Sequence, residues 1–407
     1  MIKQYISNQP PNRRQLLIAA LVVLTVATTG TAVHLYSHAA TPSGAFEAES
    51  GTLTGGATLQ TDSTASGGQS VKFGSGTTLL SWAPPVCGGA DGDTCIDLTL
   101  TNTGSHQTPS LSPNVDYRIH LPASGSLVGG ITINGGHNVQ IIGGEIDFTP
   151  SCTAAVTACM GIQVARESGT GGMVFIEGVW IKNQTSPLAN TAASYTGDGI
   201  DAYALPSPNQ TNITLENIRI DRIDGCDPGD TNHADIIQFY GIPNSAVKID
   251  GLTGSSDCQG MNIDPDYTAG TFGPGTEPSY DIRNVDIYAL NNPHTGNIGD
   301  KYTWWITGGP PECTTGGVSL TNDWAAEPNG TLSINSIWPD TDQPAGCKGV
   351  WNAGANTYTF PNTNSSALKI TGGLKQGTPP GGDFVLGNTT GGVGVAGYHY
   401  VSPGYAN

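Results

Sequence analysis

The chain has 407 residues, of which 57 are glycine and only 12% are charged, and its formal net charge is −18. A surface this acidic repels nucleic acid and anionic lipid, so we exclude both as partners, and polyanionic substrates are disfavoured unless a cation intervenes. Short β-branched runs separated by Gly, Asn, Asp and Pro, without a long amphipathic helix, predict an all-β protein.

Residues 1–39 have the composition of an export signal. Lys3, Arg13 and Arg14 precede an apolar run over residues 16–27, and residues 37–40 are small enough for cleavage. An uncleaved anchor is the alternative, although its threonines make the stretch a poor membrane span. We therefore expect a secreted or cell-surface protein that has no other membrane insertion. Without the three basic residues, 12 basic and 33 acidic residues remain, a net charge of −21.

Residues 40–80 are predicted to form a short N-terminal β segment. The stretch from Phe46 to Leu53 (FEAESGTL) and the stretch from Ala65 to Phe73 (ASGGQSVKF) resemble the first strands of carbohydrate-binding modules of the Glu-Ala-Glu-x-Gly type. Such a β-sandwich needs about 100 residues, so the segment is interpreted as a remnant of a module or as strands that cap an open sheet end.

Eight cysteines follow the signal, and an even number in an exported chain predicts disulfides. Their order suggests pairing of neighbours: Cys87–Cys95, Cys152–Cys159, Cys226–Cys258 and Cys313–Cys347. No CxxC motif is present, so a zinc or thiol-redox role is not expected.

A repeated frame dominates residues 81–390. Each copy reads apolar-x-apolar-x-(Gly or Asn), where x is any residue. The apolar residues at the third position of the five copies are separated by 35, 39, 34 and 33 residues: Ile141, Ile176, Leu215, Ile249 and Ile282. Four copies place an Ile five residues later, at Ile146, Ile181, Ile220 and Ile287. Two weaker copies centre on Ile334 and Ile370.

This frame predicts one turn of a coil per repeat. Alternating apolar residues direct one strand face inward, and the recurring Gly or Asn tolerates the left-handed backbone that a corner needs. The odd spacing to the next Ile fits a bend after that corner. A coil of 33–39 residues, stacked in register, predicts a right-handed parallel β-helix, with residues 391–407 as a C-terminal tail.

The opening coils also resemble a known superfamily. The stretch from Tyr117 to Pro122 (YRIHLP), followed by the stretch from Gly135 to Gly144 (GGHNVQIIGG), is similar to the start of pectin-lyase-like parallel β-helices, and the resemblance covers roughly residues 115–375. It implies the fold strongly, but that superfamily contains lyases, glycosidases, epimerases, tailspikes and adhesins.

A second set of strands precedes the corner in each coil and predicts a polar ladder. If Ile162, Ile200, Ile237 and Ile263 point inward, their neighbours point outward, at a spacing of about 4.8 Å that suits a sugar chain. The expected substrate-binding residues are Gln163, Tyr203, Gln238, Tyr240, Asp264 and Asp266.

The densest acidic region of the chain surrounds this ladder and supplies candidate catalytic residues. Adjacent carboxylates in different environments suit general acid and base catalysis, and an Asp near a His can orient the imidazole. The candidates are Asp198, Asp201, His233 and Asp235. Asp224, Asp227 and Asp230 in a nearby loop could bind Ca²⁺, although turns rich in Asp and Gly are common without metal. No organic cofactor is expected.

The motifs leave the reaction open. Residues 197–201 (GDGID) resemble the first acidic motif of polygalacturonase-like hydrolases, but the paired-Asp, Gly-His-Gly and Arg-x-Lys motifs have no match. The pectate-lyase signature is also missing, and Arg166, Arg219 and Arg222 are the basic residues nearest the ladder. Five tryptophans of the C-terminal third could stack on sugars or pack beneath loops.

Clustering of acids on consecutive coils favours a monomeric enzyme that cleaves a polysaccharide, as a glycoside hydrolase or a polysaccharide lyase. The alternative is a non-catalytic glycan-binding or adhesin-type surface protein in which the same ladder only binds.

Overall fold

The computed structural model describes residues 57–61, 69–73, 79–89, 94–147, 160–165, 171–183, 197–203, 211–223, 234–240, 245–264, 279–290, 303–306, 318–326, 337–338, 350–352, 357–359, 370–387, 392–393 and 395–404. The chain divides into two compact units, residues 1–76 and 77–407. All elements within the described residues are strands, so the protein is all-β, as its composition predicts. No helix of the described part is long and apolar enough to cross a membrane.

The first unit contains one described hairpin. Strands β1 (Ala57–Thr61) and β2 (Gln69–Phe73) pair antiparallel, with Ala57 opposite Phe73 and Thr61 opposite Gln69. Strand β2 lies within residues 65–73, one of the two stretches on which the resemblance to a carbohydrate-binding module is based.

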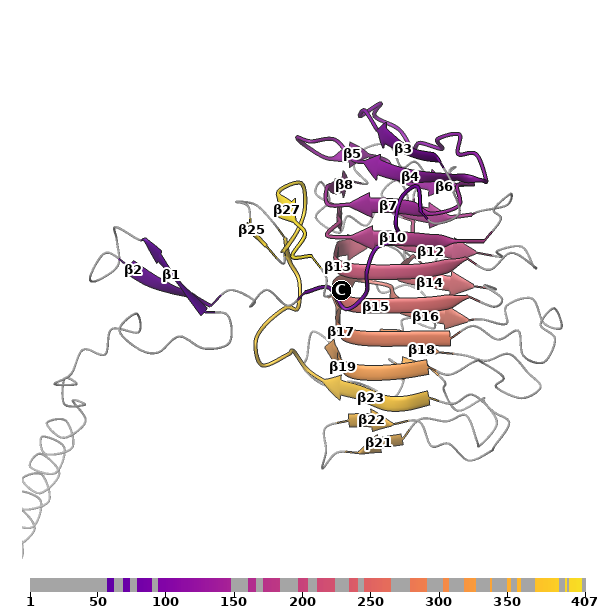
Figure 1. The fold of residues 1–407 in the computed structure, drawn as a ribbon. Coiled ribbons are helices and arrows are strands. Elements are labelled where there is room, and N and C mark those ends of the chain that lie inside the picture. Colours follow the sequence, from indigo (N-terminus) through magenta and orange to yellow (C-terminus); the bar gives the residue numbers. More distant parts are fainter. Residues whose placement is uncertain are drawn as a thin grey trace, which may run out of the picture. The chain divides into compact units, whose positions relative to one another are not determined.

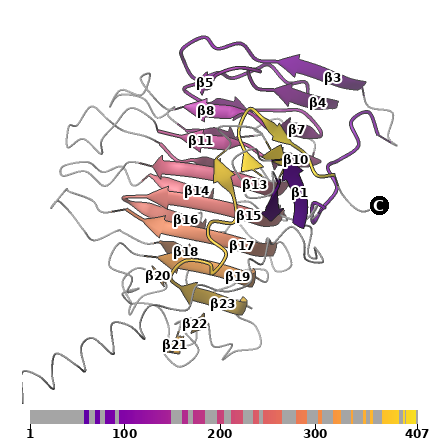
Figure 2. The same cartoon turned by 90° about the vertical axis from the view of Figure 1, so that its left-hand side faces the viewer.

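The second unit is built on two parallel sheets (Figures 1 and 2). Within the described residues, a 14-stranded sheet, called the long sheet, contains β3 (Thr94–Thr99), β4 (Val115–His120), β5 (Leu127–Val128), β7 (Val139–Ile142), β8 (Glu145–Asp147), β10 (Met173–Glu177), β11 (Trp180–Lys182), β13 (Asn212–Ile223), β15 (Ala246–Ser256), β17 (Ser279–Ala289), β19 (Val318–Ala326), β21 (Val350–Asn352), β22 (Thr357–Thr359) and β23 (Ile370–Gln376). A seven-stranded sheet, called the short sheet, contains β6 (Ile131–Ile133), β9 (Ile162–Val164), β12 (Ile200–Tyr203), β14 (Asp235–Tyr240), β16 (Gln259–Asp264), β18 (Trp304–Ile306) and β20 (Ile337–Trp338). Two small parallel pairs are β24 (Leu386–Gly387) with β26 (Val395–Ala396) and β25 (Gly392–Val393) with β27 (Tyr400–Val401).

The chain passes alternately through the two sheets. From β9 to β20, each strand of the short sheet is followed in sequence by strands of the long sheet, and each return adds a neighbour in parallel register. Figure 1 shows the result as a stack with β3 and β4 at one end and β21 and β22 at the other. Only the pairings of β21 with β22 and of β22 with β23 are antiparallel within the described long sheet.

The predicted corners are confirmed by the backbone. All five Gly or Asn residues of the regular frame have positive φ: Gly143 (66°), Gly178 (66°), Asn217 (54°), Gly251 (74°) and Asn284 (52°). Gly and Asn adopt this left-handed conformation at little cost, whereas other residues lose about 1–2 kcal/mol there. The repeat in the sequence therefore marks a repeated turn of the chain.

The core is built from rows of apolar side chains that cross the stacked strands. In the long sheet, Val139 pairs with Val174, which pairs with Ile213. All belong to one buried cluster that extends from Leu100 to Leu374. Complete burial of each such side chain contributes about 1.5–3 kcal/mol, so the rows hold the stack together.

The Ile row beyond the corner is also confirmed. Ile181 pairs with both Ile146 and Ile220. In this row Gly254 pairs with Ile220 on one side and with Ile287 on the other. A larger residue does not fit there, because a Cβ on Gly254 would lie 2.7 Å from Cγ2 of Ile236. A side chain from the short sheet thus fills the space that the missing Ile leaves.

The two weaker copies have different outcomes. Ile334 lies outside the described residues. Ile370 pairs with Val318, which belongs to a further copy of the frame that was not predicted from the sequence. This copy consists of Val318, Leu320 and Asn322, the last with φ of 62°. Ile370 therefore aligns with the first position of the frame and not with the third.

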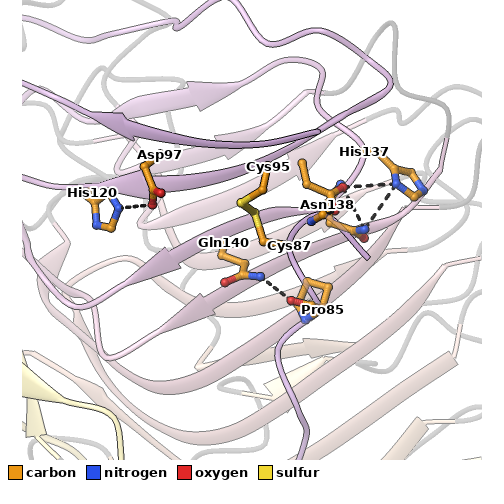
Figure 3. Close-up of a disulfide and its surroundings, with 10 residues drawn as sticks. Pro85, Cys87, Cys95, Asp97, His120, His137, Asn138 and Gln140 are labelled. Carbon is orange, nitrogen blue, oxygen red and sulfur yellow. Dashed lines mark hydrogen bonds and ion pairs between the residues drawn. A yellow bond between two sulfur atoms is a disulfide. The ribbon is translucent and has the colours of Figure 1, made fainter. Parts of the chain in front are cut away.

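Segment 79–89 is fastened to the long sheet. Cys87 forms the predicted disulfide with Cys95, and the amide of Gln140 donates to the Pro85 carbonyl (Figure 3). The Glu216 carboxylate accepts from the amides of Ser81 (3.0 Å) and Trp82 (2.7 Å). Cys258 is also disulfide-bonded, to a partner outside the described residues, so the other three predicted pairs remain predictions.

The described part of the expected C-terminal tail also packs on the long sheet. Gly397 exchanges backbone hydrogen bonds with Gly144 and Gly178, and the Tyr400 hydroxyl donates to Glu177 at 2.5 Å. The Leu80 amide donates to the Gly404 carbonyl at 2.7 Å, which joins the two terminal segments of this unit.

Candidate active site

A row of polar side chains crosses the short sheet. Its successive members pair in register and alternate along each strand with buried core residues such as Ile162 and Ile200, so they point away from the core. We call it the outer row; it consists of Thr132, Gln163, Asp201, Gln238, Asn262 and Trp305. The prediction that Gln163, Asp201 and Gln238 share one face is confirmed.

The register differs from the expected one at β16. Asn262 pairs with Gln238, whereas Asp264 pairs with Tyr240. Met261 and Ile263 are both buried in the core, so an alternating pattern alone could not decide which of them lies beside Ile237. Asn262, and not Asp264, is therefore the outer-row member on β16.

Three of the four predicted catalytic residues lie together at β12 and β14. The Asp198 carboxylate accepts the backbone amide of Asp235 at 2.7 Å. The Asp235 carboxylate accepts the side-chain amide of Gln238 at 2.9 Å, and Asp201 accepts that of Gln163 at 3.3 Å. Each of the three carboxylates thus accepts a hydrogen bond from an amide group of β9 or β14.

All three carboxylates are buried, with exposed fractions of 7% for Asp198, 1% for Asp201 and 0% for Asp235. Burial raises the pKa of Asp201 to about 7, against the hydrogen bond from Gln163 and with the help of the Asp235 charge. Burial also raises the pKa of Asp198 well above its usual range, and the charges of Asp235 and Asp201 add to this effect. The cluster therefore retains protons at pH values at which ordinary carboxyls are ionised.

Other predicted residues remain untested. His233, Asp266 and the predicted Ca²⁺ ligands Asp224, Asp227 and Asp230 lie outside the described residues. For Tyr203, Tyr240 and Asp264 only the strand positions are described; the three pair in register, two residues beyond the outer row. Within the described ranges, no group of His, Cys, Asp and Glu side chains is arranged to hold a metal ion.

The described basic residues nearest the cluster in the sequence lie in the long sheet. Arg219 lies in β13 of the long sheet and forms ion pairs with Asp221 (2.7 Å) and Asp383 (2.8 Å). Arg222 also lies in β13, with φ of 63°. Arg166 lies outside the described residues. Lys182 in β11 is buried against Glu145.

The tryptophans of strands β18 and β20 occupy different positions in the short sheet. Trp304 is buried completely in the core, as the packing hypothesis predicts. Trp305 continues the outer row beyond Asn262, and the backbone register places Trp338 beside it on β20. An aromatic residue thus follows the polar members of the row.

Sequence reasoning also missed two residues at the other end of the row. Thr132 donates to Gln163 at 3.0 Å, and His106 Nε2 lies 2.7 Å from the Thr132 hydroxyl. No motif marks His106, which reaches the row because the Gln107 amide bonds to the Gly130 carbonyl and so holds this segment beside β6.

No protein-family model, no curated protein and no solved structure matches the chain.

Proposed function

We propose that residues 77–407 form a right-handed parallel β-helix of the pectin-lyase-like type. Alternation between two parallel sheets, constant register and the left-handed Gly and Asn corners support this architecture. The right-handed sense is the one that crossovers between parallel strands of one sheet adopt in nearly all proteins.

We propose that the protein is exported and cleaves a polysaccharide at Asp198, Asp201 and Asp235. The observation that carries this proposal is the clustering of three carboxylates, one with a pKa raised to about 7. In this proposal Asp201 is the general acid, which protonates the glycosidic oxygen, and Asp235 is the ionised partner. The Cys87–Cys95 disulfide fits an oxidising compartment outside the cytoplasm.

Hydrolysis is favoured over elimination. A lyase removes a proton beside a uronate carboxylate and needs a basic side chain together with a positive charge that neutralises the acid. Arg219 and Lys182 are bound to carboxylates, and the cluster combines three acids. Such a site suits acid-catalysed hydrolysis of an uncharged chain, because uronate would be repelled.

The outer row supplies contacts along a sugar chain. Amide groups of Gln163 and Gln238 flank Asp201 on the two adjacent strands, and Asn262 follows on the next strand, with a spacing of about 4.8 Å between strands. Trp305 offers an indole at the end of the polar stretch, where aromatic rings commonly stack on sugar faces. Because the three acids are buried, this face must open when substrate binds.

A panel of polysaccharides tests the proposal. The secreted protein is incubated with uncharged glucans, mannans and xylans and with pectate and alginate. We expect new reducing ends from an uncharged member. Unsaturated uronate products would show a lyase instead, and binding without any product would support the alternative of a glycan-binding surface protein.

A further inference from the structure

A chain of hydrogen bonds connects Asp201 to a histidine across three neighbouring segments. Asp201 Oδ2 accepts from Gln163 Nε2 at 3.3 Å, and Gln163 Oε1 accepts from the Thr132 hydroxyl at 3.0 Å. The same hydroxyl lies 2.7 Å from His106 Nε2, while His106 Nδ1 lies 2.7 Å from the Gly129 carbonyl. The chain ends there, because a carbonyl oxygen only accepts.

The directions of these hydrogen bonds depend on one another. The Thr132 hydroxyl has one proton, and the Gln163 amide donates only through its nitrogen. When Gln163 donates to Asp201, its oxygen takes the Thr132 proton, and Thr132 must accept from His106 Nε2. Since His106 Nδ1 donates to the Gly129 carbonyl, the ring is then an imidazolium. Asp201 is the acceptor at the other end of the chain, the role that a carboxylate fills best.

A second arrangement has the same number of protons but no charges. The Gln163 amide is turned over, so that its nitrogen donates to Thr132 and its oxygen accepts the proton of a neutral Asp201. Thr132 then donates to Nε2 of a neutral His106. A mixed state, with neutral His106 and ionised Asp201, sets two lone pairs against each other and loses a buried hydrogen bond.

We propose that His106 is a positioning residue for Asp201: through Thr132 and Gln163, the two share one proton, and at neutral pH this proton lies on Asp201. The inference rests on the proposed function, in which Asp201 is the general acid. His106 touches no reacting atom; it makes ionisation of Asp201 unfavourable while its own ring is neutral.

The surroundings of both ends favour the uncharged arrangement. Burial lowers the pKa of His106, and the bond to Gly129 only partly offsets this effect. Within the described residues, no charged side chain acts on His106. Asp201 is buried, and the charge of Asp235 opposes a further negative charge on it.

Two variants of Thr132 test the coupling, since Thr132→Val removes the hydroxyl at nearly constant shape and Thr132→Ser retains it. Carbon-13 NMR of labelled Asp carboxyls, assigned with Asp201→Asn, follows ionisation without substrate. We expect Thr132→Val to lower the midpoint of Asp201 by about one pH unit, because Gln163 can then turn freely to the carboxylate. Thr132→Ser should titrate as the wild type does. Equal midpoints in all three proteins would overturn the proposal, and so would equal shifts in both variants.

Nitrogen-15 NMR of the wild type is a second test, which measures the protonation of the two ring nitrogens of His106. The variant His106→Gln is used only to assign the signals. We expect His106 at pH 7 to carry its proton on Nδ1 and to have a bare Nε2. A protonated Nε2 would overturn the proposal. Both readings are independent of any polysaccharide, so a failed cleavage assay would count against the proposed function and not against the coupling.

Discussion

The Asp201 side chain is nearly inaccessible to solvent, and its carboxyl keeps its proton at pH values well above those at which an ordinary Asp ionises. Its folded pKa of about 7 exceeds the ordinary value of 3.8, so the folded protein binds this proton more tightly than the unfolded chain does. The resulting stabilisation is complete below pH 3.8 and is lost as the pH rises through 7.

Asp201→Asn removes this dependence, because an amide does not titrate and can still accept from Gln163. We expect the unfolding temperature of the variant, relative to the wild type, to rise between pH 4 and pH 8. Thermal unfolding followed by circular dichroism over that range measures the difference. A constant difference would contradict a raised pKa at this position.

The site was only partly predictable at the level of residues. Asp198, Asp201 and Asp235 could be found because acids gather near strands of a recognised repeat. His106 and Thr132 could not, since no local pattern relates residue 106 to residue 201, and only the stacked register joins them through hydrogen bonds.

At the scale of elements, the corners of the repeat differ in how tightly neighbouring side chains pack against them. Gly143 and Gly178 occupy equivalent corners with the same φ of 66°, but their surroundings differ. A Cβ on Gly178 would lie 2.2 Å from Tyr400 Cδ1, whereas one on Gly143 would lie 3.3 Å from Tyr400 Cβ. The same substitution therefore has different consequences at the two corners.

Both Gly143→Ala and Gly178→Ala place a side chain in the left-handed region, at a cost of about 1–2 kcal/mol. Only Gly178→Ala also displaces the Tyr400 ring, so we expect its free energy of unfolding to fall further, by at least about 1 kcal/mol. Urea unfolding of the two variants gives the comparison. Equal destabilisation would show that Tyr400 does not pack on this corner.

The strands of the long sheet were predictable where the repeat is regular. The copy from Val318 to Asn322 was not predicted, although its third position, Leu320, follows Ile282 by 38 residues, within the range of the other copies. The next copy was predicted at Ile334 instead. An alternating pattern also cannot distinguish two strand registers that differ by two residues, because both place the same side chains on the inner face. In β16 the pairing with β14 determines the register.

At the scale of the second unit, a few specific contacts hold segment 79–89 against the long sheet. The disulfide between Cys87 and Cys95 closes a short loop with a sequence separation of 8, and the Glu216 carboxylate holds the amides of Ser81 and Trp82. The disulfide attaches the segment to β3, the next strand in the sequence, whereas Glu216 attaches it to β13, more than 100 residues away.

Replacement of both cysteines by serine should lower the free energy of unfolding by about 2–3 kcal/mol, as expected for a loop of this length. Amide hydrogen exchange should rise first in residues 79–89, while the core of the long sheet stays protected. Unchanged exchange in that segment would mean that the Glu216 contacts suffice to hold it.

The most direct test of the proposed function compares reducing-end release by the wild type, Asp201→Asn and Asp286→Asn on the polysaccharide that the panel identifies. Asp286 is a matched control, since it is also buried and its pKa is raised to about 6, but it lies in β17 of the long sheet. We expect Asp201→Asn to lose at least about 100-fold in rate, as is usual for a missing general acid, and Asp286→Asn to stay near the wild type. Equal rates in the wild type and Asp201→Asn would contradict an active site at this cluster.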